Sequence, residues 1–389
     1  MKVVTNTYLR KKCPMLNKNF RFFIKVIVFI VFFIPYFAFS NSKKCEYDKK
    51  LCDKLNQVVG IKTPMMVASG TLINDELIVT NRHVVEDHEQ FIIRFNDGRI
   101  KKAFPLPHNF PADLAILTLN KETNISNQFV QSSEINGMIR VIAFDQGRKS
   151  NRIYDKGKII SFTDIKTFPQ SRIHTDAKSL PGNSGGAVVD DTGNLVGILA
   201  SGDGNINEII PISLVNEVIK NTSKQHKENF FKIGNNIRLC ADNLEEAQYI
   251  QKNLNDKIAN NIDNYCWNSK NKQLIDQAGQ TFGRLGDLNK ARKFLEKSLT
   301  LDPSSPNSLI SLAIVYHIQR DLEKERPLIL KLLKLTPENP QVLRLGVQVA
   351  GILKDKNMSD NVLELMSKYN KDALPLAKKF IENAFKSNQ

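Results

Sequence analysis

Short hydrophobic runs separated by turns dominate the chain from Gln57 to about residue 220. Turn sequences such as Asn96-Asp97-Gly98 separate the runs, and no stretch of helical period lies between them. Short strands with this punctuation are typical of a barrel or a sandwich, so the pattern predicts an all-β domain. The predicted strands include Gly70–Ile73, Glu76–Thr80, Phe91–Phe95, Leu114–Leu119, Arg140–Phe144 and Lys158–Phe162.

From Gln225 to Gln389 the hydrophobic positions follow a helical period, and the pattern repeats every 34 residues. The repeating units are 272–305, 306–339 and 340–373, with Asp287, Asp321 and Asp355 at matching positions. This arrangement resembles tetratricopeptide repeats, with Gly279 and Ala291 where two helices approach closely. Asp302-Pro303 is predicted to end the second helix of the first unit. A last helix around Leu374–Phe385 is predicted to cap the stack.

Repeats of this kind stack helix pairs into a concave surface that holds a peptide or a protein. We therefore expect the repeats, residues 272–389, to recruit substrate or a protein partner. The competing interpretation is a passive scaffold that only packs against the rest of the chain. Residues 223–271 are predicted to form a helical connector.

The first 40 residues have the pattern of an export signal. A basic segment precedes the apolar run Val26–Ile34, and Ala38-Phe39-Ser40 provides small residues before a polar stretch. Cleavage is expected after Ser40. An uncleaved membrane anchor is the alternative, because the apolar stretch approaches spanning length, although Lys25 and Pro35 interrupt it. Either interpretation places the rest of the chain outside the cytoplasm, in the periplasm or secreted.

Composition limits the number of domains and the class of partner. A chain of 389 residues with 41% hydrophobic content can build two ordinary domains with cores. The net charge of +15 suggests nucleic acid, but seven basic residues lie before residue 41 with no acidic residue among them. The other lysines are spread among polar residues without a basic stripe, so no nucleic-acid partner is expected.

Cysteine usage agrees with export. Apart from Cys13 in the signal, four cysteines remain, an even number that allows three pairings. The local pairs are Cys45 with Cys52 and Cys240 with Cys266, and the sequence alone does not choose among the pairings. None of the spacings matches a zinc site, so neither a metal nor another cofactor is expected.

The stretch Leu180–Val189 carries the candidate chemistry. Ser184 lies between glycines and precedes an apolar strand, which is one way to expose a hydroxyl beside backbone N–H groups. The residues Gly182–Gly186 also fit the strand-to-helix elbow of α/β-hydrolases. A hairpin with an Asp-Thr-Gly-Asn turn follows them instead of a helix, so this interpretation fails. The better partners lie upstream, in the order His83, Asp113, Ser184, which is that of the chymotrypsin-type triad.

Several motifs in this order resemble the protease domain of the HtrA/DegP family of trypsin-like serine proteases, over roughly residues 55–220. They are Ser69–Ile73, Val79–Val85, Asp113–Leu117, Thr175–Ala177, Pro181–Gly186 and Ile210–Ile212. The resemblance implies two small antiparallel barrels, with His83 and Asp113 on the first and Ser184 on the second. An oligomer is suggested by the resemblance alone. The family's usual PDZ domains have no counterpart here, since the helical repeats follow instead.

The chemistry assigns each residue a role. His83 would take the proton of Ser184 and later give it to the leaving amine, and Asp113 would orient the imidazole. The N–H groups of Gly182 and Ser184 would bind the developing oxyanion. By the family pattern, Leu180, Ala200 and Ser201 would form a small apolar substrate pocket. Alternatively, Lys178 would favour an acidic side chain.

The sequence therefore predicts four segments: a signal peptide (1–40), a trypsin-like protease domain (41–222), a helical connector (223–271) and the repeats (272–389). The expected function is that of an exported serine endopeptidase, acting on proteins or peptides through an acyl-enzyme. A membrane contact is expected only if the signal stays uncleaved. The alternative is a pseudoprotease that serves as an adaptor or scaffold.

Overall fold

The computed structural model describes residues 45–119, 131–132, 137–202, 205–251 and 254–387. The predicted signal peptide lies outside these residues. The chain divides into a unit Met1–Glu46 and a unit Tyr47–Gln389, and the second contains every helix and strand given below.

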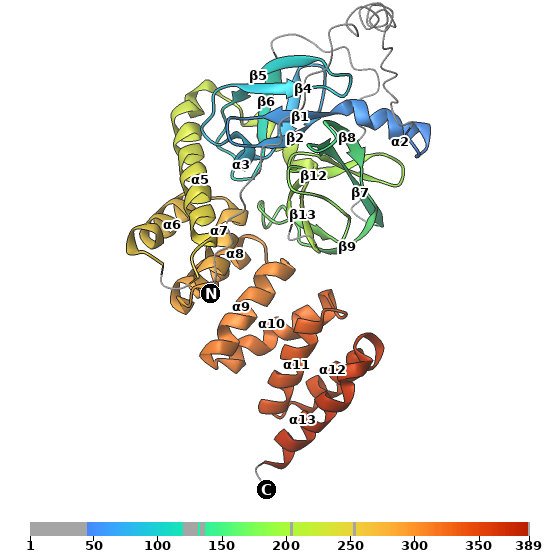
Figure 1. The fold of residues 1–389 in the computed structure, drawn as a ribbon, viewed down its shortest axis with the longest axis vertical. Helices are drawn as coiled ribbons and strands as arrows, with labels where there is room; N and C mark the ends of the chain where they lie inside the picture. Colours follow the sequence, from blue (N-terminus) through green and yellow to red (C-terminus); the bar gives the residue numbers. More distant parts are fainter. Residues whose placement is uncertain (1–44, 120–130, 133–136, 203–204, 252–253, 388–389) are drawn as a thin grey trace, which may run out of the picture. The chain divides into compact units, whose positions relative to one another are not determined.

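Six strands form a first, closed antiparallel barrel in the order β1-β2-β3-β6-β5-β4 (Figure 1). They are β1 (Val58–Lys62), β2 (Val67–Leu72), β3 (Leu77–Thr80), β4 (Phe91–Arg94), β5 (Ile100–Leu106) and β6 (Ala115–Leu119). Alternating burial explains why these segments form strands. In β4, Phe91 and Ile93 face the core while Ile92 and Arg94 are exposed. The predicted strands in this region are confirmed to within a few residues.

A second antiparallel sheet follows in the order β11-β12-β13-β10-β9-β7-β8, and it closes into a barrel because β11 also pairs with β7. Its strands are β7 (Met138–Asp145), β8 (Ser150–Ile153), β9 (Gly157–Phe162), β10 (Ile173–Thr175), β11 (Ala187–Asp190), β12 (Leu195–Gly202) and β13 (Asn207–Pro211). Strands β11 and β12 form the hairpin predicted after Ser184. Gly193 takes φ +80° at its turn, and Asp190 accepts the Thr192 and Asn194 N–H groups. The double-barrel architecture is therefore confirmed.

Helices make up the chain after the second barrel. The short helices are α2 (Lys49–Asp53), η2 (Lys54–Gln57) and α3 (Arg82–Val85), which precede the second barrel, and α4 (Ser213–Lys220), η3 (Lys224–His226) and η4 (Lys371–Ala373), which follow it. The long ones are α5 (Lys227–Gln248), α6 (Asp256–Asn268), α7 (Lys272–Arg284), α8 (Leu288–Leu301), α9 (Pro306–Gln319), α10 (Leu322–Leu335), α11 (Pro340–Ile352), α12 (Lys356–Tyr369) and α13 (Leu374–Lys386). The predicted cap of the repeat stack is α13.

The repeat period appears in the helix ends. Asn271, Ser305 and Asn339 cap the first helix of each unit with their side-chain oxygens, 34 residues apart. A Cβ on Gly279 would lie 2.7 Å from Leu295 Cγ, so a small residue is needed where α7 meets α8. Helix α8 ends at Leu301, as the Asp-Pro pair predicts. The repeat prediction is thus confirmed.

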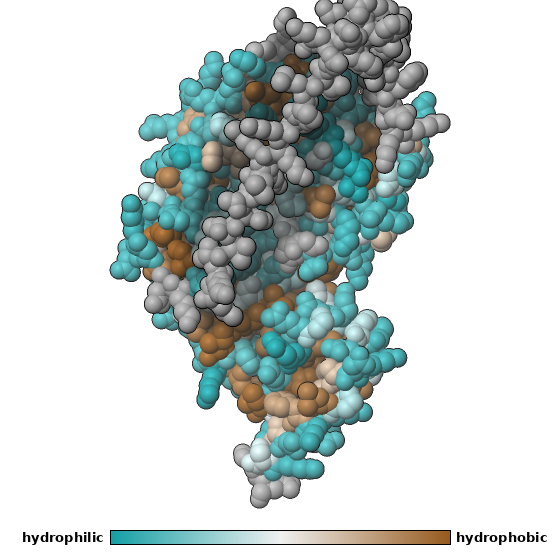
Figure 2. Space-filling view, in the orientation of Figure 1, coloured by the Kyte–Doolittle hydropathy of each residue, from teal (hydrophilic) through white to brown (hydrophobic). Residues whose placement is uncertain are grey.

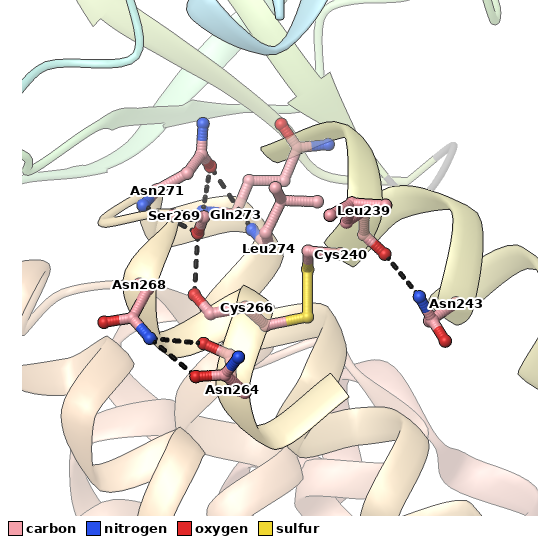
Figure 3. Close-up of a disulfide and its surroundings, with 10 residues drawn as sticks. All are labelled: Leu239, Cys240, Asn243, Asn264, Cys266, Asn268, Ser269, Asn271, Gln273 and Leu274. Atoms are coloured by element: carbon pink, nitrogen blue, oxygen red, sulfur yellow. Dashed lines mark hydrogen bonds between the residues drawn. A yellow bond between two sulfur atoms is a disulfide. The ribbon is translucent and has the colours of Figure 1, made fainter. Parts of the chain in front are cut away.

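The predicted connector shares its core with the repeats. Buried side chains of α5 and α6, including Ile237 and Ile262, pack in one cluster with those of α7, α8 and α9. The Cys240–Cys266 disulfide joins α5 to α6 within this cluster, as the local pairing expects (Figure 3). Cys45 and Cys52 are disulfide-bonded as well.

The surface of the repeat helices is mixed. Figure 2 shows hydrophobic side chains among hydrophilic ones over the helices that Figure 1 colours orange to red. The large apolar side chains of α9 to α13 that stay exposed are Ile318, Ile352, Tyr369, Leu376 and Phe380. Among the described residues, no helix is both long enough and apolar enough to cross a bilayer.

Candidate active site

The loop that holds Ser184 requires glycine at two places. Gly182 and Gly185 take φ values of +88° and +87°, which L side chains rarely adopt. A Cβ on Gly185 would also lie 2.0 Å from Ser69 O, on strand β2 of the first barrel. The glycines therefore let the loop turn sharply and press against the first barrel, while Ser184 itself stays half-buried.

Asn183 fixes this loop from within. Its side-chain oxygen accepts the Leu180 N–H at 2.7 Å, and its amide donates to Phe144 O at 3.0 Å. In the described part of the chain, the Gly182 and Ser184 N–H groups donate to no protein acceptor. Two free donors beside a hydroxyl form a site that can receive a negatively charged oxygen.

His83 and Asp113 meet directly. His83 lies on α3, and its Nδ1 is 2.9 Å from Asp113 Oδ2, while its backbone N–H donates to Asp113 Oδ1 at 3.0 Å. The Asp113 side chain is 1% exposed and that of His83 is 16% exposed. Burial raises the pKa of Asp113, but the facing His83 and Arg172 lower it by more, so the carboxyl pKa lies below its usual range. An ionised Asp113 accepts from Nδ1–H, so Nε2 is the ring nitrogen that does not contact Asp113.

The Ser184 hydroxyl is turned away from this pair. Its Oγ donates to Ala200 O at 2.9 Å, and in the described residues no hydrogen bond joins it to His83. The backbone nevertheless holds Ser184 beside the first barrel, since the Ser69 N–H donates to Ser184 O at 2.8 Å. Thr80, three residues before His83, in turn donates to Ser69 O at 2.8 Å. A rotation of the Ser184 side chain is therefore needed to complete a triad.

The three predicted pocket residues lie in different environments. Leu180 is 49% exposed, whereas Ala200 is fully buried and offers its carbonyl to Ser184. Ser201 donates to Glu208 Oε2 at 3.1 Å. Lys178, the alternative determinant, is exposed.

Asn207 was not predicted from the sequence. Its side chain accepts from Ser179 Oγ at 2.8 Å and donates to Ala177 O at 2.6 Å. A Cβ on Gly202 would lie only 1.7 Å from Asn207 Oδ1. Asn207 thus links the segment before Ser184 to the end of β12.

A second feature without a sequence signal is a buried cluster of charges between β10, β13 and the first repeat unit. Lys272 Nζ lies 2.5 Å from Glu208 Oε1 and 3.8 Å from Asp302 Oδ2. His174 Nε2 lies 2.8 Å from the same Asp302 oxygen. Burial raises the pKa of Glu208, but the charges of Lys272 and His174 outweigh burial and hold it at about 2. Glu208 therefore stays ionised beside Lys272, and the cluster ties the second barrel to the helices.

The connector and the repeats also contact the His83–Asp113 pair. Asn271, the cap of α7, donates to Asp113 Oδ1 at 2.8 Å. A Cβ on Gly234 of α5 would lie 2.0 Å from Glu86 O, directly after α3, so this helix packs closely behind His83. A cavity of about 290 Å³ lies against Asp113 and Asn271. Within the described residues no cluster of His, Cys, Asp or Glu is arranged to hold a metal ion.

Comparisons with known proteins match two parts of the chain. Residues 68–198 match the trypsin-like peptidase domain, and residues 273–305 match a tetratricopeptide repeat. The chain is 28% identical over 157 residues to the serine endoprotease DegS of Escherichia coli (strain K12), a match covering 39% of this chain and 43% of DegS. It is 30% identical over 174 residues to a probable periplasmic serine endoprotease DegP-like of Buchnera aphidicola subsp. Schizaphis graminum (strain Sg), covering 41% of this chain and 35% of that protein.

A solved structure of the HtrA-type protease AlgW with tripeptide has 26% identity and a TM-score of 0.38, and covers 44% of this chain and 61% of that one. The chain spans less than half the length of the DegS and DegP-like relatives that it matches. The resemblance indicated by the motifs is confirmed: the chain carries a trypsin-like peptidase domain similar to that of DegS and DegP-like proteases, followed by a tetratricopeptide repeat.

Proposed function

We propose that this chain is an exported serine endopeptidase that cleaves proteins or peptides through an acyl-enzyme. The observation that carries the proposal is the His83–Asp113 hydrogen bond of 2.9 Å, together with Ser184 beside two free N–H donors. DegS and the DegP-like relative are named as serine endoproteases, which supports the same reaction class.

In the proposed reaction, the Ser184 hydroxyl leaves the Ala200 carbonyl and donates to His83 Nε2. His83 takes the proton as Oγ attacks the substrate carbonyl, and Asp113 stabilises the resulting imidazolium. The N–H groups of Gly182 and Ser184 bind the oxyanion, each contributing about 3–4 kcal/mol in related chemistry. His83 then protonates the leaving amine, and water releases the acyl group by the reverse steps.

Export is part of the proposal. The pattern of residues 1–40 supports it, and so do the disulfide-bonded cysteines, because such bonds persist in oxidising compartments. The DegP-like relative is described as periplasmic.

The test is labelling by a fluorophosphonate probe and digestion of casein, with Ser184→Ala as the matched control. Loss of the nucleophile should lower turnover on the order of a million-fold. Labelling and digestion that are both absent from the folded, disulfide-bonded wild-type protein would contradict the proposal. That outcome would favour the pseudoprotease, which the Ser184 hydrogen bond to Ala200 also fits.

We propose further that the repeats recruit protein substrates. Exposed apolar side chains on α9 and α13, such as Ile318 and Leu376, support this role. Ile318→Asp and Leu376→Asp should then lower kcat/KM for casein and leave hydrolysis of a small ester unchanged. Equal rates on casein for the variants and the wild-type protein would instead favour a passive scaffold.

A further inference from the structure

The carboxylate of Asp113 receives a side-chain hydrogen bond from the helical half of the chain. Asn271 Nδ2 donates to Asp113 Oδ1 at 2.8 Å, across 158 residues of sequence. Asp113 is 2% exposed and Asn271 is 3% exposed, so water does not compete for this bond. In the described residues, His83 and Asn271 are the two residues whose side chains hydrogen-bond this carboxylate.

The other neighbours of Asp113 do not fix its direction in the same way. Arg172 is fully buried, but its nearest nitrogen is 3.7 Å from Asp113 Oδ2, too far for a hydrogen bond. Asn81 and the Arg82 N–H donate to the backbone carbonyl of Asp113, not to its carboxylate. Arg172 therefore supplies charge, whereas Asn271 supplies orientation together with the His83 backbone N–H, which also donates to Asp113 Oδ1 at 3.0 Å.

Asn271 can present its NH₂ group in one direction only. Its side-chain oxygen accepts the N–H groups of Gln273 and Leu274 at 3.0 and 3.3 Å, because it caps α7. With the oxygen engaged by the helix, the NH₂ group is left for Asp113. Figure 3 shows both capping bonds converging on the Asn271 oxygen.

The surrounding backbone holds Asn271 in place. Its N–H donates to Ser269 Oγ at 3.2 Å, and Ser269 Oγ donates to Cys266 O at 2.7 Å (Figure 3). Cys266 is disulfide-bonded to Cys240 on α5. On the other side, the next residue, Lys272, is buried against Glu208. Covalent and ionic anchors therefore flank the donor.

We propose that Asn271 is a positioning residue for Asp113, so that the helical region completes the active site of the peptidase domain. Asn271 holds Oδ1, which turns Oδ2 toward His83 Nδ1 and keeps the imidazole aligned for proton transfer. This inference rests on the proposed function, because it assigns a partner to the proposed catalytic carboxylate.

The test compares Asn271→Asp with Asn339→Asp. Asn339 occupies the matching place two repeat units later and caps α11 in the same way, through the Gln341 and Val342 N–H groups. Aspartate caps a helix as well as asparagine, so both variants keep the cap. In Asn271→Asp the donor is replaced by a second carboxylate facing Asp113, whereas Asn339→Asp changes nothing near Asp113.

Hydrolysis of p-nitrophenyl acetate, corrected with Ser184→Ala, gives kcat, KM and their pH dependence. We expect Asn271→Asp to lower kcat about 10- to 100-fold with KM unchanged within about twofold. The acid limb of the kcat/KM profile should move to higher pH, because the added carboxylate favours the protonated imidazole. Asn339→Asp should match the wild-type protein in all three measurements. Asn271→Ser, which keeps a cap without reaching Asp113, should lower kcat without the shift of the acid limb.

Wild-type kcat and pH profile in both Asn271 variants would overturn the inference while leaving the proposed function intact. A loss of kcat in Asn271→Asp that is matched in Asn339→Asp would also overturn it, because the cause would then be helix stability. An inactive, folded wild-type protein would overturn the proposed function and this inference together, since no catalytic carboxylate would need positioning.

Discussion

The first and third repeat units begin alike but lie in different surroundings. Asn271 and Asn339 both cap their helices by accepting two backbone N–H groups. Asn271 is buried and also donates a hydrogen bond to Asp113. The next residue, Lys272, is fully buried as well. Pro340, which follows Asn339, is exposed. Helix capping is local chemistry that the repeat copies, whereas among the described residues Asn271 contacts the Asp113 carboxylate and Asn339 does not.

The ion pairs of the repeat units also differ in burial. Asp302 in the first unit is fully buried and pairs with Lys272 and His174. In the second unit, Lys324 pairs with Asp321 while its side chain remains 59% exposed. A buried charge depends on its partner, whereas water solvates an exposed charge when its partner is lost.

Replacing Lys272 by methionine should have the largest effect on stability. It leaves Glu208 and Asp302 buried without their cation, which should lower the free energy of unfolding by about 3–5 kcal/mol. Urea unfolding measures the change. Lys324→Met, the exposed counterpart, should show none; equal losses in both variants would mean that burial does not distinguish the two pairs.

Removing the Cys240–Cys266 disulfide should have a somewhat smaller effect. The bond closes a loop over a sequence separation of 26 residues, so its loss in Cys240→Ala/Cys266→Ala should cost about 3 kcal/mol. The third unit has no such staple among the described residues. Fluorophosphonate labelling should also slow, because the segment carrying Ser269 and Asn271 loses an anchor. An unchanged labelling rate would show that the Cys240–Cys266 disulfide does not influence the active site.

The stability of the buried cluster around Lys272 should also depend on pH. The pKa of Glu208 is held at about 2, below its unfolded value near 4.3, so its ionisation stabilises the fold above that unfolded value. This stability should be fully present above about pH 5 and be lost as the pH falls toward 2. Urea unfolding at a series of pH values tests this in the wild-type protein and in Lys272→Met. The acid loss should be weaker in the variant, because without Lys272 the pKa of Glu208 is no longer held as low; identical curves would contradict the assignment.

Asn339→Ala should have the smallest effect. It removes a cap and nothing else, so the free energy of unfolding should fall by about 1 kcal/mol with kcat unchanged. Thermal unfolding and ester hydrolysis check both expectations. A change in kcat would show that the third unit, too, influences the active site.

Much of the fold follows from patterns that are local in sequence. Alternation in Phe91–Arg94 predicts a half-buried strand, and the glycines around Ser184 predict a sharp turn. The 34-residue period predicts matching helix ends. The order of His83, Asp113 and Ser184 along the chain is enough to group them as one candidate site, because each lies in a short motif of its own. Such motifs depend on residues a few positions apart.

The rest of the site could not be predicted because its signals are not local. Asn207 is an ordinary strand residue until Gly202 and Ser179 come close to it. The direction of the Ser184 hydroxyl depends on the Ala200 carbonyl, which arrives from another strand.

Periodicity and short motifs thus predict an all-β domain, the helical repeats and the candidate triad, and the family resemblance adds the double barrel. The contact of Asn271 with Asp113, and those of Lys272 with Glu208 and Asp302, arise only in the folded chain. In the sequence Asn271 and Lys272 are polar residues at a helix start, where exposure to water is the rule. Their burial, and hence their strong interactions, comes from packing the first repeat unit against the barrels.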